Sequence, residues 1–154
     1  MLIREQPATD LTVATRILAR AGAIAPDGRV TLRLNDVIYV SGRGVSNHTM
    51  TPYDVVSILL ADGTPLIGEP PADLVEQIAL HRRSPDAVAV GRAADGALVA
   101  APSLRACAIA LLARQRGEAG RTDDATIERS WHELVAEARV AGALIGAFPT
   151  EEHA

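Results

Sequence analysis

Short β-type segments joined by tight turns fill the first half of the chain and limit the possible folds more than any other feature. The four segments span residues 29–34, 37–41, 55–60 and 65–67. The pair Asn35-Asp36 joins the first two, and the pair Asp62-Gly63 joins the last two. Because such pairs reverse the chain within a few residues, the sequence predicts two hairpins and a mostly antiparallel sheet.

Helical patterns flank these hairpins. The first begins at Thr9 or Asp10, residue types that cap helices, and ends at Gly22. The remaining expected elements are a helix opened by Pro70 and Pro71 and ending near Ser84, strands at 87–90 and 96–100, a helix at 103–114, a loop at 116–124 and a helix at 125–146. No repeat or linker divides the chain. We therefore expect one α+β domain over residues 1–154, with helices against the central sheet.

Composition indicates what fills the core and which partners are excluded. Hydrophobic residues make up 48% of the chain but aromatic residues only 3%, so Ala, Val, Leu and Ile must form the core. A formal charge of −4 does not indicate a basic surface for nucleic acid. No apolar run approaches the roughly 18 residues of a membrane span. The single Cys107 lies in an Ala-rich helical run and fits the core of a protein in the reducing cytoplasm.

Three strings in order carry a resemblance to a known family. GRVTLR at residues 28–33 resembles the pattern G-N-I/V-S-x-R, and MTPYDVV at 50–56 resembles M-T-P-x-D followed by two aliphatic residues. SPDAVAV at 84–90 is similar to R-P-D-x-x-A-V. Between the first two, IYVSGRG at 38–44 is similar to a strand followed by a T-P-x-G loop. Over residues 9–92 the chain thus resembles the class II aldolase/adducin family of sugar-phosphate aldolases, epimerases, decarboxylases and the adducin head domain.

The resemblance implies a zinc site that this sequence lacks. Family enzymes continue with H-x-H after the third string, where this chain has Arg92 and Ala94, and Asp95 corresponds to a third metal histidine. A catalytic zinc needs about three ligands from His, Glu or Cys, whereas arginine stays protonated and alanine has no donor atom. The four histidines, which show no metal-binding spacing, are His48, His81, His132 and His153. We therefore predict no bound metal and no other cofactor.

The resemblance also implies an acid/base residue, the Glu of a P-S-S-E string. Asp73 has this place in the string Pro70-Pro71-Ala72-Asp73, where the two phosphate-binding serines are lost. Asp73, Gln77 and His81 follow at i, i+4 and i+8, so on a helix they share one side and Asp73 and His81 are candidates for proton transfer. The alternatives are a carboxylate that favours the helix N-terminus and a histidine that favours its C-terminus.

Two arginines lie where the family has small polar residues near the substrate phosphate. Arg29 follows Gly28, and Arg43 precedes Gly44. Glycine lets the backbone approach a ligand closely, and an arginine fork binds carboxylate or phosphate through two hydrogen bonds. Together with Gln77 and Arg92, these four residues are the candidate binding residues for a small anionic metabolite. The alternative is that the arginines are solvated surface charges.

Two functions remain open at this stage. One is a metal-independent enzyme that performs proton abstraction, retro-aldol cleavage, decarboxylation or a related isomerisation or cyclisation on a small anionic carbonyl or hydroxy acid. Without a metal, arginine or backbone donors must stabilise the enolate. The other is a non-catalytic, adducin-like scaffold or ligand-binding protein. Because family members assemble with sites between subunits, the resemblance also implies a homo-oligomer, either a tetramer or a dimer.

Overall fold

The computed structural model describes residues 5–115. Its helices are α1 (Glu5–Arg20), η1 (Pro52–Asp54, a 3-10 turn), α2 (Val75–Arg83) and α3 (Leu104–Gln115). Its strands are β1 (Val30–Leu34), β2 (Val37–Ser41), β3 (Val55–Leu59), β4 (Pro65–Ile67), β5 (Ala89–Arg92) and β6 (Leu98–Ala101). None of the helices described between residues 5 and 115 is long and apolar enough to cross a membrane.

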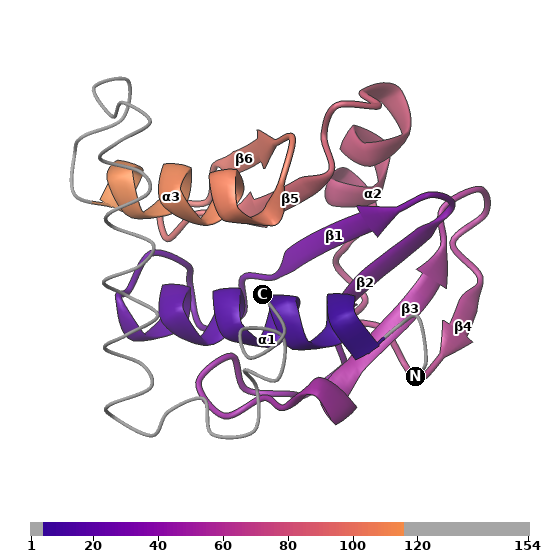
Figure 1. The fold of residues 1–154 in the computed structure, drawn as a ribbon, viewed down its shortest axis with the longest axis horizontal. Helices are drawn as coiled ribbons and strands as arrows, with labels where there is room; N and C mark the ends of the chain where they lie inside the picture. The colour runs from indigo at the N-terminus through magenta and orange to yellow at the C-terminus, as the bar shows by residue number, and fades with distance from the viewer. Residues whose placement is uncertain (1–4, 116–154) are drawn as a thin grey trace.

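The strands form one antiparallel sheet in the order β4-β3-β2-β1-β5-β6 (Figure 1). Both predicted hairpins are present, and each turns at a residue with positive φ, Asn35 at 55° and Gly63 at 76°. Asparagine and glycine tolerate this left-handed conformation better than other residues. The second pairing of β1, to β5, brings residues 61 positions apart together, with Val30 opposite Gly91.

Helices α1 and α3 pack side by side on one face of the sheet (Figure 1). The core there is aliphatic, as the composition predicts, with Leu11 and Leu18 of α1 and Leu111 of α3 fully buried. Gly91 lets α3 come close, because a Cβ atom at this position would lie 2.6 Å from Leu111 Cδ1. Helix α3 can therefore pack closely against the sheet, because Gly91 on β5 has no side chain.

Helix α2 lies on the opposite face. A smaller apolar cluster joins Ile38 and Val40 of β2 to Ile58 of β3 and to Leu74 at the start of the helix. Towards β1 and β5 the contacts of α2 become polar, through the buried side chains of Gln77 and His81. This change from apolar to polar packing positions most of the residues considered below.

The α+β class and the antiparallel sheet agree with the prediction, but two helix starts were wrong. α1 begins at Glu5 rather than at Thr9 or Asp10, with Pro7 in its first turn, where proline's missing N–H costs nothing. α2 begins at Val75 rather than at the two prolines. The segment before it is tied to the loop after β2, since Arg43 N–H donates to Glu69 O at 2.9 Å and Arg43 Nε to Pro70 O at 3.2 Å.

The other boundaries are closer to expectation. α1 ends before Gly22 (φ 72°), whose N–H donates to Ala19 O while Ala23 N–H donates to Leu18 O, the pair of bonds that closes a helix C-terminus. β5 and β6 each begin two residues later than predicted and end one or two residues later. The expected loop at 116–124 and helix at 125–146 lie outside the described residues.

Candidate functional site

Arg29 is held at the start of β1 by its side chain. Its Nη1 lies 3.0 Å from Ser41 Oγ, 2.9 Å from Val45 O and 3.1 Å from Asn47 Oδ1. These acceptors belong to the end of β2 and to the glycine-containing loop that follows it. The guanidinium is thereby fixed against this loop through one nitrogen, while Nη2 and Nε have no hydrogen-bond partner in the described part of the chain.

Asn47 completes this arrangement from the loop. Its side chain is buried, and Nδ2 donates to Gly28 O at 2.7 Å and to Pro26 O at 3.2 Å. Gly28 is itself buried, and a Cβ atom there would meet Arg92 O at 3.1 Å and Ala25 O at 3.2 Å. The close approach predicted for Gly28 is therefore made to the protein's own backbone.

The electrostatic surroundings of Arg29 combine burial with two acids. Burial lowers the pKa of the guanidinium, while the negative charges of Asp73 and then Asp27 raise it. Arginine remains charged under these conditions. The Coulombic effect of Asp73 shows that the predicted carboxylate lies within electrostatic range of the predicted anion-binding arginine. Asp73 itself is exposed, just before α2.

Arg43 and Gly44 lie in the same loop but on the surface. Arg43 pairs with Glu69 at 3.3 Å, and both side chains are mostly exposed, at 55% and 73%. Gly44 is exposed with φ 76°, and a Cβ there would meet no atom within 4 Å. An exposed pair of this kind contributes little to stability, so Arg43 remains available to a ligand that competes with Glu69.

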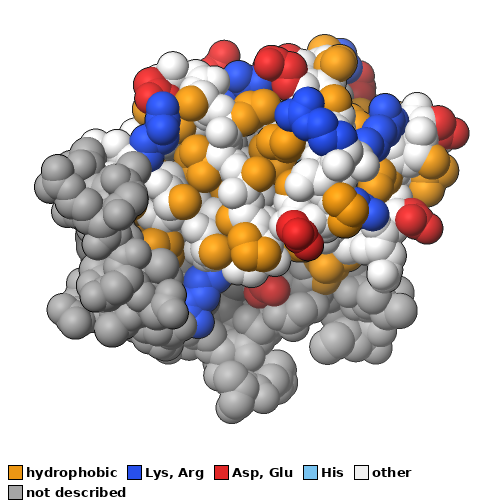
Figure 2. Space-filling model, turned by 90° about the horizontal axis from the view of Figure 1, so that it is seen from above, with side chains coloured by type: hydrophobic (Ala, Val, Ile, Leu, Met, Phe, Trp, Pro, Cys, Tyr) orange, Lys and Arg blue, Asp and Glu red, His pale blue; other side chains and the backbone are white. Residues whose placement is uncertain are grey.

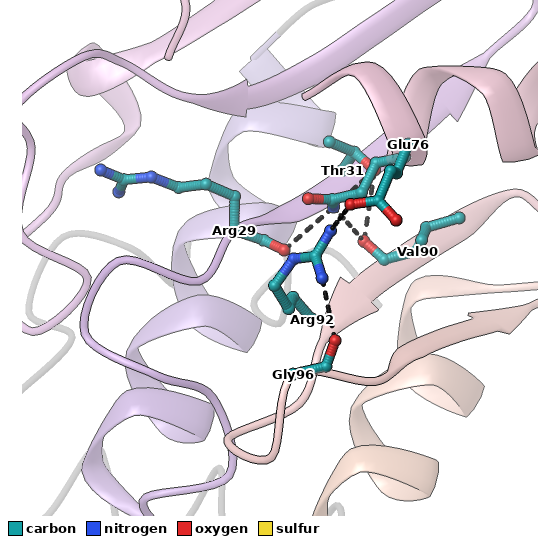
Figure 3. Close-up of polar contacts among 7 residues, drawn as sticks. Arg29, Thr31, Glu76, Val90, Arg92 and Gly96 are labelled. Atoms are coloured by element: carbon teal, nitrogen blue, oxygen red, sulfur yellow. Dashed lines mark hydrogen bonds and ion pairs between the residues drawn. The ribbon is translucent and has the colours of Figure 1, made fainter. Parts of the chain in front are cut away.

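Gln77 points into the sheet instead of into a cleft. It is 1% exposed, and its Nε2 lies 3.0 Å from Arg29 O, 3.1 Å from Val90 O and 3.3 Å from Thr31 Oγ1. In Figure 3 Arg29, Thr31 and Val90, which accept these bonds, lie close together, while the Arg29 side chain runs away from them. The amide of Gln77 is thus used to attach α2 to two strands.

His81, one turn further along α2, is fully buried and bonded at both ring nitrogens. Nδ1 lies 2.7 Å from Ala87 O, and Nε2 lies 2.7 Å from Thr31 Oγ1. Because a carbonyl only accepts, Nδ1 must carry the proton, and a neutral ring then accepts the Thr31 hydroxyl proton at Nε2. Burial lowers the pKa of His81, and the charge of Arg33 lowers it further. The predicted role of His81 in proton transfer stays a prediction.

The residues at the implied metal positions do not fit a zinc ion. Arg92 Nη2 pairs with Glu76 Oε1 at 2.9 Å, and its Nη1 donates to Gly96 O at 2.8 Å (Figure 3). Ala94 offers no side-chain donor, and Asp95 is bound to Arg114 Nη2 at 2.9 Å. Between residues 5 and 115, no three His, Cys, Asp or Glu side chains gather into a metal-binding group.

The candidate residues therefore separate into two groups. Arg29, Gly28, Arg43 and Gly44 border the loop after β2, with Asp73 in electrostatic range of Arg29. Gln77, His81 and Arg92 tie α2 to β1, β5 and the β5–β6 turn. The sequence analysis did not predict that Ser41 and Asn47 would orient Arg29. Nothing in the local pattern singled out Thr31, the partner of His81.

This architecture is of the class II aldolase type, which confirms the predicted resemblance at the level of the fold. Comparison with solved structures finds YgbL from Escherichia coli, a candidate aldolase/epimerase/decarboxylase, with a TM-score of 0.51 and 24% identity over 58% of this chain. It also finds L-fuculose 1-phosphate aldolase from Glaciozyma antarctica PI12, with a TM-score of 0.51 and 22% identity over 59%.

These matches are partial. They span 44% and 41% of the two proteins, so the chain corresponds to less than half the length of each. No protein-family model matches the sequence. No curated protein matches it either. At these identities the likeness concerns the fold, and function must be argued from the site.

Proposed function

We propose that this protein is a divergent aldolase-like enzyme that works without a metal on a small anionic carbonyl or hydroxy-acid substrate. Its chemistry is acid/base: proton abstraction next to a carbonyl, retro-aldol cleavage or decarboxylation. Arg29 binds the anionic group and Asp73 exchanges the proton. The aldolase-type fold supports the reaction class only coarsely, so the proposal depends on the residues around Arg29.

The observation that carries the proposal is the half-satisfied guanidinium of Arg29. One nitrogen is anchored to the loop through Ser41, Val45 and Asn47, while Nη2 and Nε are free of protein acceptors in the described chain. Such a group presents a pre-oriented pair of donors, which suits a carboxylate or an enolate oxygen. Asp73 supplies a carboxylate within electrostatic range.

Metal independence rests on donor chemistry. Arg92 already places a positive charge where the family resemblance implies a metal ligand, and its guanidinium is satisfied by Glu76 and Gly96. Arginine does not ligate metals, because it retains its proton. Stabilisation of a developing oxyanion therefore falls to guanidinium and backbone donors.

Assembly is a further part of the proposal. The site lies at a loop on the surface, with Arg43 and Asp73 exposed. A second subunit that covers this loop would exclude water from it and strengthen its electrostatic interactions. We therefore propose a homo-oligomer, a dimer or a tetramer.

The second candidate function is a non-catalytic scaffold or ligand-binding protein. It is favoured by one specific observation, namely that Gln77 and His81 are buried and bonded to the protein itself. With these two groups used in packing, Asp73 is the one predicted proton-transfer residue that solvent reaches. The choice between the two functions thus depends on Asp73.

Deuterium exchange tests the choice directly. The protein is incubated in D2O with a panel of small keto and hydroxy acids, with a strong chelator present, and exchange next to the carbonyl is followed by NMR. We expect exchange with at least one acid. Asp73→Asn should reduce its rate by about 10²–10⁴-fold while binding is kept. Arg29→Met should weaken binding by on the order of tenfold to a hundredfold.

Two variants separate ligand contacts from loop support. Asn47→Ser removes a loop anchor but leaves the free edge of Arg29, so it should affect stability more than binding. Arg43→Ala should weaken binding if Arg43 leaves Glu69 for the ligand. Binding without any exchange, unaffected by Asp73→Asn, would favour the scaffold. Exchange that stops when the chelator is added would refute metal independence.

A further inference from the structure

Arg16 is a partly buried arginine that forms no ion pair with any acid of the described residues. It lies on α1 and is partly buried, with Nε inside the protein and without a hydrogen-bond partner. Its one contact is from Nη1 to Met50 O, at 3.4 Å, which is longer than a good N–H···O bond. No carboxylate of the described residues pairs with it.

Other arginines of the chain show how unusual this is. Arg43 and Arg114 are exposed and Arg92 is partly buried, and each pairs with an acid, at 3.3, 2.9 and 2.9 Å for Arg43, Arg92 and Arg114. On the face seen in Figure 2, arginines and acidic side chains are interspersed among apolar ones. Because solvent already stabilises exposed charges, these pairs are the less necessary ones.

Arg29 provides the closer comparison, because burial lowers its pKa as it lowers that of Arg16. In Arg29 the charges of Asp73 and Asp27 oppose this effect. For Arg16 burial is the one cause found among residues 5–115, so no acid in that part of the chain offsets the loss of solvent. A charge removed from water without a partner is costly, and proteins normally pair it.

Asp54 of η1, an acid on an element that α1 contacts, is already hydrogen-bonded. α1 packs against η1, and Asp54 of η1 accepts hydrogen bonds from Thr51 N–H at 2.8 Å and from Thr51 Oγ1 at 3.3 Å. Asp54 therefore caps its own turn and does not face Arg16. The backbone at Met50, which Arg16 contacts, is flanked by the exposed hydroxyl side chains of Thr49 and Thr51.

We propose that Arg16 anchors a second anion-binding site, at the junction of α1 with residues 49–51, for the carboxylate or phosphate of a small molecule. The oxyanion accepts from Nη2 of Arg16, which is neither buried nor bonded to the described chain, and the exposed hydroxyls of Thr49 and Thr51 flank the carbonyl that Nη1 contacts. This site differs from the one proposed at Arg29, which contacts the loop through Val45 and Asn47. Arg29 thus contacts the loop after β2 at Val45 and Asn47, and Arg16 contacts the same loop at Met50.

Two measurements test the site on the full-length protein, with inorganic phosphate as the probe. The first is the midpoint of thermal unfolding, Tm, in chloride and in phosphate at equal ionic strength. The second is the ¹⁵N–¹H spectrum of the arginine Nε–H groups. For the intact chain we expect phosphate to raise Tm by on the order of 5 °C at about 100 times Kd. The Nε–H resonance of Arg16 should shift as phosphate is added.

Arg16→Met should reduce the phosphate response in Tm to whatever part the Arg29 site contributes. In chloride this variant should be as stable as the intact chain or more so, because it replaces an uncompensated buried charge by an apolar chain of similar length. Arg83→Met, at an exposed position on α2, is the matched control and should keep the full response. Arg29→Met should keep the phosphate-dependent shift of the Arg16 Nε–H resonance, whether or not it loses part of the Tm response, so failure at Arg29 and failure at Arg16 are distinguishable.

Several results would overturn this inference. A loss of stability for Arg16→Met in chloride, with no phosphate response in the intact chain, would make Arg16 purely structural. An Nε–H resonance of Arg16 that is already hydrogen-bonded without phosphate would mean that the protein supplies the anion itself. If that bonding appears only at high protein concentration, the anion is a carboxylate of a second copy.

Discussion

The His81 ring on α2 is bonded to Thr31 on β1 and to Ala87 just before β5. Its protonation state therefore affects the free energy of unfolding. In the neutral ring, which burial favours, Nδ1 donates to Ala87 O and Nε2 accepts from the Thr31 hydroxyl, which also lies 3.2 Å from Val90 O. Burial lowers the pKa of His81 below its usual 6.5. The unfolded chain therefore binds a proton at a higher pH than the folded one.

We accordingly predict that the free energy of unfolding is constant above about pH 6.5 and decreases as the pH falls through the folded pKa of His81. Urea unfolding between pH 8 and pH 5 measures this. His81→Gln should be less stable at pH 8 but should lack the decrease. The exposed His48 is the control, and His48→Gln should follow the intact chain. Asp62 and Asp95 have pKa values lowered from 3.8, so their effects fall at lower pH.

At the residue scale, the sequence predicted spacing well and surroundings poorly. Helical periodicity correctly placed Gln77 and His81 on one face of a helix. Whether that face meets solvent or Thr31 depends on which residue β1 turns towards α2, and local pattern does not specify this. Asp73 was expected on the same helix, but the backbone contacts of Arg43 to Glu69 and Pro70 delay the helix start.

At the scale of elements, the edge strand β4 depends on the glycine that follows it. Gly68 has φ 77°, and a Cβ atom there would clash with Val56 on β3. Gly63, in the turn before β4, has φ 76° but open space around its Cα. The two glycines thus share one backbone conformation and differ in their steric surroundings.

Replacing each by alanine should separate these two contributions. Gly63→Ala should cost about 1–2 kcal/mol, the penalty for a left-handed non-glycine residue. Gly68→Ala should lower the free energy of unfolding by about 1–3 kcal/mol more than Gly63→Ala, because its Cβ atom also overpacks against Val56. Urea unfolding of both variants measures the difference. Equal destabilisation would mean that β4 shifts away from β3 at no cost.

Element boundaries were predicted best where a residue sets its own backbone conformation. Asn35, Gly63 and Gly22 each adopt positive φ, and the turns and the helix end fall where these residues predict them. β5 and β6 were displaced by one or two residues because their pairing partners, and not their own sequence, decide where they begin. The hydrogen bonds from Arg29 to the loop after β2 were not predicted, because they join residues 16 and 18 positions apart.

At the scale of the whole molecule, the one cysteine of the chain reports on opening of the core. Cys107 is fully buried on α3, and burial raises its pKa to about 12. At pH 8 roughly one thiol in ten thousand is then ionised in the folded state, and the thiolate is the reactive form. A thiol reagent can therefore modify Cys107 efficiently only after the protein unfolds.

We predict that a thiol reagent modifies the native protein at least about a thousandfold more slowly than the urea-unfolded chain. If residues 5–115 unfold as one cooperative unit, a change at the far edge of the sheet must also accelerate this reaction. Gly68→Ala, on the β4 side, should raise the labelling rate at Cys107 by the factor that its loss of unfolding free energy dictates. An unchanged rate in a destabilised variant would show that the β3–β4 edge opens separately from the core under α3.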